Sequence, residues 1–117
     1  MLRNTIGAVL AAALHHTTSA PAAPQAESAL ECGIAADMAI VAHSLAREEV
    51  QRPKAGAIME RIYDVAASDR GQRLMTDILA AAYAVQGSGS SQKFAENLFA
   101  TCMASGGNMD TILGKRL

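Results

Sequence analysis

Residues 27–52 read ESALECGIAADMAIVAHSLAREEVQR and form the longest periodic segment of the chain. Large apolar side chains recur along this segment at helical spacing, at Leu30, Ile34, Met38, Val41 and Leu45. A second stripe of smaller residues lies about 160° around the same helix, at Cys32, Ala36, Ala39 and His43. We therefore expect a helix over residues 28–52 that has neighbours on both sides and forms the centre of the fold.

The chain contains two cysteines, Cys32 in this helix and Cys102 near the opposite end. A small exported domain normally pairs two cysteines, because its compartment is oxidising. The sequence therefore predicts a Cys32–Cys102 disulfide, with free thiols or an intermolecular bridge as the alternatives. Redox catalysis by the cysteines is not expected, because the sequence has no C-x-x-C motif.

The first 22 residues have the features of a secretory signal peptide. Arg3 precedes an apolar run over residues 5–14, and small residues follow this run. We expect cleavage after Ala22, with Ala26 as the alternative. The apolar run is shorter than the roughly 20 residues that span a bilayer. Residues 23–117 are thus predicted to be a soluble exported domain without a stable membrane span, periplasmic in a Gram-negative bacterium and otherwise secreted.

The composition and periodicity of the remaining chain also favour helices. Half of the residues are hydrophobic (50%) but only 3% are aromatic, so alanine and aliphatic side chains must form the core. Three further helices are expected, over residues 54–67, 70–86 and 92–105. Ser68 or Asp69 and the serines before residue 92 are suitable N-caps, and Gly106-Gly107 is a suitable helix end.

Together these elements predict one all-α domain, a compact bundle of four short helices plus a C-terminal turn, stapled by the disulfide. Because Cys32 belongs to the small stripe, we expect the helix that carries Cys102 to pack on that side of the first helix. The other two helices are expected on the large stripe. In the C-terminal turn, Asn108 is the expected cap.

Two polar residues of the first helix are candidates for a pH-sensitive contact. His43 is the single histidine of the predicted mature domain, and Asp37 borders the large stripe. The alternative for His43 is a half-buried side chain that is hydrogen-bonded between helices. The sequence has no spacing of ligands typical of a metal site, and no two acidic or basic groups are placed for proton transfer. We therefore expect no catalytic, cofactor-binding or metal-binding residue and no enzyme activity.

Met59 and Met109 lie near the edges of their apolar faces and are candidates for a partner surface. The alternative is that they fill gaps in a core rich in alanine. Nucleic acid is not an expected partner, because the net charge is −1 and basic residues do not cluster.

These features favour a non-enzymatic exported protein of the protein-binding or inhibitor/immunity type, whose partner is another protein. An acid-stress chaperone of the cell envelope and a carrier of small apolar ligands are the alternatives. The layout resembles two bacterial families. Acid-stress chaperones of the HdeA type share the signal peptide, short helices and single disulfide. Amidase immunity proteins of type VI secretion share the signal peptide, helical domain and well-separated cysteines. The resemblance assigns no functional residue.

Overall fold

The computed structural model describes residues 24–64 and 68–114, and within these ranges it contains five helices and no strand. The predicted signal peptide and residues 65–67, the end of the second predicted helix, lie outside the described residues. The helices are α2 (Ala29–Arg47), α3 (Arg52–Ile62), α4 (Asp69–Ala84), α5 (Ser91–Ala104) and α6 (Asp110–Leu113). The all-α bundle is therefore confirmed.

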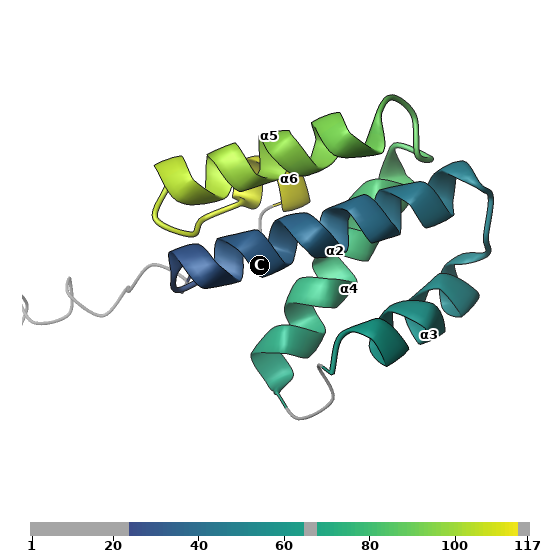
Figure 1. Cartoon of the computed structure of the whole chain (residues 1–117), viewed down its shortest axis with the longest axis horizontal. Coiled ribbons are helices and arrows are strands. Elements are labelled where there is room, and N and C mark those ends of the chain that lie inside the picture. The colour runs from purple at the N-terminus through teal and green to yellow at the C-terminus, as the bar shows by residue number, and fades with distance from the viewer. Residues whose placement is uncertain (1–23, 65–67, 115–117) are drawn as a thin grey trace, which may run out of the picture.

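Helix α2 is the centre of the bundle, as its sequence predicts, and it packs against α3, α4 and α5. Figure 1 shows α5 running antiparallel along one side of α2, while α4 crosses α2 obliquely and α3 lies on the other side. A disulfide joins Cys32 of α2 to Cys102 of α5, with a Cα–Cα distance of 5.7 Å. The expected position of α5, on the Cys32 side of α2, is thus correct.

The buried face of α2 differs from the expected one. It consists mainly of small side chains, namely Cys32, Ala35, Ala39, Ala42 and Ala46, together with Met38 and His43. Leu30 and Ile34 begin the large stripe, yet they are 74% and 40% exposed. Small side chains allow neighbouring helices to approach closely, so the alanine face takes the tightly packed position. The large stripe then lies at the side of this interface, and only its Met38 is fully buried.

The starts of three helices follow a common capping pattern. The Ser28 hydroxyl accepts a hydrogen bond from the Glu31 backbone N–H, Ser68 accepts one from Gly71, and Ser90 accepts one from Lys93. Ser68 and Ser90 are among the caps that the sequence predicts. At α6 the Asn108 side chain accepts from the Asp110 N–H, although Met109 occupies the N-cap position itself.

Helix α2 ends at Arg47, five residues before the predicted end at residue 52. Glu49 adopts a left-handed conformation (φ 59°), and the Val50 N–H donates to the Leu45 carbonyl. This arrangement is a Schellman motif, in which glycine is the usual left-handed residue. The same motif follows α4, where Gln86 is the left-handed residue (φ 55°). After α5 the left-handed residue is Gly106 (φ 61°), as predicted.

Replacing Glu49 by glycine is expected to stabilise the fold by about 0.5–1 kcal/mol. Glycine adopts the left-handed conformation without the steric cost of a Cβ atom, and this gain exceeds its extra entropy in the unfolded chain. Urea denaturation measures the change. Glu48→Gly is the matched control, because Glu48 has φ −85°, where glycine brings no such gain. Equal effects of the two substitutions would contradict the assignment.

The segment before α2 is bound to the turn between α5 and α6. The Ala26 N–H donates to the Gly107 carbonyl (3.1 Å), and Ala26 is fully buried. The Gln25 side chain accepts from the Met109 N–H (2.8 Å) and donates to Asp110 (2.7 Å). These contacts join the two ends of the described chain independently of the disulfide.

Helix α2 is also, among the described helices, the one whose length and apolar composition would suffice to cross a membrane. Core helices of soluble proteins meet the same criteria, and α2 buries its alanine face within the bundle. Its composition is therefore explained by its central position.

Candidate functional site

His43 lies at the junction of α2, α5 and the loop between α4 and α5. It is fully buried, and its ring stacks on Phe94 at 4.9 Å between centroids. Nε2 lies 2.9 Å from the Ser88 carbonyl, and Nδ1 lies 2.7 Å from the Ser91 hydroxyl. Because a carbonyl can only accept, Nε2 carries a proton and donates to Ser88. The His43 side chain is thus more deeply buried than the half-buried side chain that the sequence suggested.

Asp37 lies apart from His43 and has a different partner. Its carboxylate accepts a hydrogen bond from the hydroxyl of Tyr63, the residue that follows the end of α3. Burial and the Asp37 carboxylate together raise the pKa of Tyr63 above its ordinary value. The structure therefore does not bring His43 and Asp37 into one site, and a pH-sensitive role of either residue remains a prediction.

Met59 and Met109 do not form a partner surface, because both side chains are fully buried. Methionine is long and unbranched, so from the edge of an apolar face it can bend into gaps between small alanines. Both residues fill the core, which was the alternative that the sequence left open.

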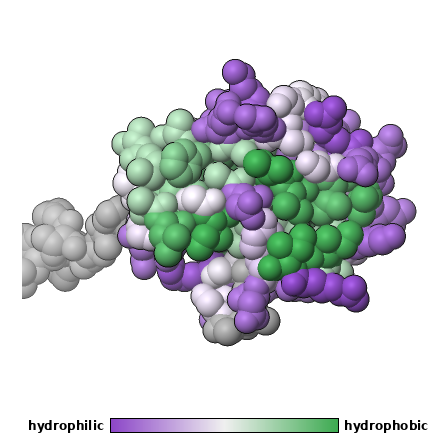
Figure 2. Space-filling view, viewed as in Figure 1, coloured by the Kyte–Doolittle hydropathy of each residue, from purple (hydrophilic) through white to green (hydrophobic). Residues whose placement is uncertain are grey.

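An apolar groove of about 770 Å³ lies between α2, the end of α3 and the start of α4. Met38 and Leu74 form its buried floor, and Leu30, Ile34 and Ile62 form its exposed apolar walls. Residues 65–67, between the groove residues Asp64 and Ser68, are not described. The space-filling view shows green apolar surface over much of this face, with purple polar groups mainly around its edge (Figure 2).

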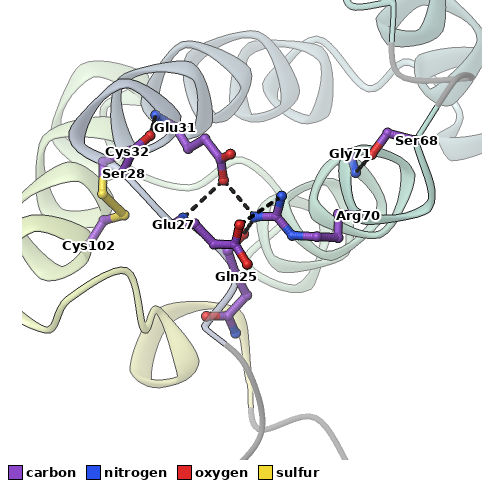
Figure 3. Close-up of polar contacts among 9 residues, drawn as sticks. All are labelled: Gln25, Glu27, Ser28, Glu31, Cys32, Ser68, Arg70, Gly71 and Cys102. Carbon is purple, nitrogen blue, oxygen red and sulfur yellow. Dashed lines mark hydrogen bonds and ion pairs between the residues drawn. A yellow bond between two sulfur atoms is a disulfide. The ribbon is translucent and has the colours of Figure 1, made fainter.

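Arg70 connects α4 to the start of α2 at one end of the groove. Its guanidinium lies 2.6 Å from the Glu31 carboxylate and 3.5 Å from Glu27. Figure 3 shows Arg70 reaching across to these two carboxylates, with Gln25 beside them. The hydrogen bond from Arg70 lowers the pKa of Glu31, so that this carboxylate stays ionised beside the cation.

The sequence does not predict this groove, because the large apolar stripe of α2 indicates contact with other helices along its whole length. The large stripe of α2 predicts a packed interface, and the structure instead leaves its first half facing open space. The signal that could have indicated it is Leu30-x-x-x-Ile34, two large apolar residues that have acidic residues three positions away, at Glu27, Glu31 and Asp37. Tyr63 and Arg70, which frame the groove, belong to no sequence motif.

The groove is lined by both apolar and polar side chains. Two pairs of polar side chains in the groove are in contact, Asp37–Tyr63 and Glu31–Arg70, and the polar residues Gln25, Asp64 and Ser68 also line it. Within residues 24–64 and 68–114, no three histidine, cysteine or acidic side chains lie close enough to hold a metal ion. The volume of the groove, about 770 Å³, falls within the range of known ligand sites, roughly 300–1,000 Å³.

Comparisons with protein-family models, with curated proteins and with solved structures found no match to this chain.

Proposed function

We propose that this protein is an exported, non-enzymatic binding module, and that the groove beside α2 takes an apolar segment of a partner protein. The observation that carries the proposal is the exposure of the groove walls. Leu30, Ile34 and Ile62 are 74%, 40% and 54% exposed, although each lies on a helix next to a packed core. Large apolar side chains grouped around a hollow are typical of protein interaction sites.

Covering these walls would supply a substantial part of a binding free energy. A fully buried aliphatic side chain contributes about 1.5–3 kcal/mol relative to its exposed state. The three wall residues are already partly buried in the free protein, so a partner that covers them gains only part of this free energy. A gain of a few kcal/mol is enough to anchor a partner when it is concentrated in a small cluster of contacts.

An inserted protein segment fits the groove better than a small apolar ligand does. A carrier would enclose its ligand almost completely, whereas the walls here stay open to solvent along one side, as their exposure shows. A helix or extended segment of a partner can lie in such an open groove, because the rest of the partner covers the open side.

Export is part of the proposal, supported by the disulfide and by the N-terminal sequence. Disulfides persist in oxidising compartments and are rare in a reducing cytosol. The contacts of Gln25 and Ala26 support cleavage after Ala22 rather than after Ala26. A chain that begins at Ala23 keeps both residues on the turn before α6, and a chain that begins at Glu27 loses them.

Capture of the partner from an envelope extract of the source organism tests the proposed function. Wild type, Ile34→Asp and Ile40→Asp are immobilised after thermal denaturation has shown that both variants fold. Ile40 is the matched control, because it lies on the same helix and is 42% exposed, close to the 40% of Ile34, but does not line the groove.

We expect wild type and Ile40→Asp to retain the same protein, and Ile34→Asp to lose it, because a buried carboxylate without a partner is strongly unfavourable in an apolar contact. Capture of nothing above background by wild type, or equal capture by Ile34→Asp, would contradict the proposal.

A further inference from the structure

We infer that the groove selects an amphipathic segment that combines apolar side chains with lysine or arginine, and that Asp37 receives the cation. This inference rests on the proposed function and specifies the chemistry of the partner. It follows from the charges around the groove, from the position of Asp37 within the apolar walls, and from the length of the groove along α2.

The charged residues that line the groove are mostly acidic. The lining contains three carboxylates, Glu31, Asp37 and Asp64, and one cation, Arg70. Arg70 is already compensated, because Glu31 lies 2.6 Å and Glu27 lies 3.5 Å from its guanidinium. The groove therefore carries a negative potential, although the whole chain has a net charge of only −1. A partner with matching positive charge associates faster and is favoured over an acidic one.

Asp37 is the carboxylate best placed to meet such a charge. It lies on α2 between Ile34 and Met38, so a cation at Asp37 sits beside apolar groups at the wall and the floor. The Tyr63 hydroxyl donates to Oδ2, which fixes the carboxylate without neutralising it. A tyrosine hydroxyl is protonated at neutral pH and is therefore able to donate. Oδ1 of Asp37 is then the oxygen that accepts a hydrogen bond from a lysine or arginine of the partner.

The dimensions of the groove match a short helical segment. From Leu30 to Met38 the α2 axis advances about 12 Å, at 1.5 Å per residue, which corresponds to about two turns of a partner helix. Two turns present apolar anchors at spacings of three and four residues on one face, with a basic residue at the border of that face. An amphipathic helix with leucines on one side and lysines beside them has this pattern.

Two synthetic peptides test the inference directly. Each is a fluorescein-labelled 15-residue amphipathic helix with leucines at identical positions, and the remaining positions carry lysine in one peptide and glutamate in the other. Fluorescence anisotropy measures their dissociation constants for wild type, Asp37→Asn, Ile34→Asp and Glu48→Gln. Glu48 is the matched control for the lost charge, because it is exposed on the cap of α2 and does not line the groove.

We expect wild type to bind the lysine peptide and not the glutamate peptide. Asp37→Asn should weaken binding of the lysine peptide by about two- to fivefold, the effect of losing one exposed ion pair, while Glu48→Gln changes it much less. Raising the salt concentration should reduce the difference between wild type and Asp37→Asn, because screening weakens the ion pair.

The outcomes separate the two proposals. If Ile34→Asp abolishes binding but Asp37→Asn binds the lysine peptide as wild type does, the groove is a binding site and the role of Asp37 is wrong. Equal binding of both peptides by wild type, or binding of neither, would overturn the inferred preference for basic segments. If Ile34→Asp binds the lysine peptide as tightly as wild type, the peptide lies elsewhere, and the proposed function loses its support as well.

Discussion

Replacing Cys32 and Cys102 together by alanine is expected to lower the free energy of unfolding by about 4 kcal/mol. The disulfide joins residues 70 positions apart, and a cross-link over so long a loop strongly restricts the unfolded chain. Domains of this size have total stabilities of about 5–15 kcal/mol, so the loss is a large share. The midpoint of thermal unfolding should fall by roughly 20 °C, since 1 kcal/mol corresponds to about 4–8 °C in a domain of up to 100 residues.

Adding a reductant is the internal control for this prediction. It should lower the midpoint of wild type to about that of the double alanine variant and leave the variant itself unchanged. Alkylation followed by mass spectrometry should modify two thiols in reduced wild type and none in the oxidised protein. An oxidised protein with two reactive thiols, or a wild type whose midpoint does not respond to reductant, would contradict the intramolecular disulfide.

The positions of helix ends show where local sequence is enough and where it is not. Ser68 and Ser90 act as N-caps, and Gly106 ends α5 within one residue of the predicted end, because each of these residues carries its own conformational signal. The ends of α2 and α4 carry no such signal, since Glu49 and Gln86 occupy the left-handed positions. The backbone there forms local hydrogen bonds, from Val50 N–H to the Leu45 carbonyl and from Gly87 N–H to the Ala82 carbonyl, and the sequence patterns extend both helices too far.

The choice of the buried face of α2 also depends on tertiary packing. Hydrophobicity patterns favour the largest residues, whereas close approach between helices favours the smallest, and α2 contains a stripe of each kind. The disulfide correctly predicts which side α5 occupies, because Cys32 belongs to the small stripe. The groove lies between the first half of α2, the end of α3 and the start of α4, an arrangement of three helices that no local pattern records.

Replacing Gly107 by alanine is expected to destabilise the protein by about 2–4 kcal/mol, through strain in the backbone and overlap with the segment before α2. Gly107 has φ +93°, and an added Cβ would lie 1.9 Å from the Ala26 carbonyl oxygen and 2.8 Å from the Ala26 carbonyl carbon. Both atoms belong to the backbone, so the overlap cannot be relieved by a side-chain rotation. The Ala26 N–H would have to leave the Gly107 carbonyl.

The neighbouring glycine provides the control for this effect. Gly106 also has a positive φ (+61°), but an added Cβ there would meet nothing within 4 Å. Gly106→Ala should therefore cost only the conformational strain, about 1–2 kcal/mol. Urea denaturation of the two variants measures the difference, which reports the contact with Ala26. Equal losses at the two positions would mean that the segment before α2 is not held against the turn.

Removing the contacting segment should abolish that difference. In a chain that begins at Glu27, the atoms that the new Cβ would overlap are absent, so Gly107→Ala loses its steric cost and keeps only the strain of its positive φ. The four chains, with and without residues 24–26 and with glycine or alanine at 107, form a double-mutant cycle whose coupling energy measures the contact. A coupling near zero would exclude the contact, whereas a large one would show that Gly107 is needed to hold the segment before α2.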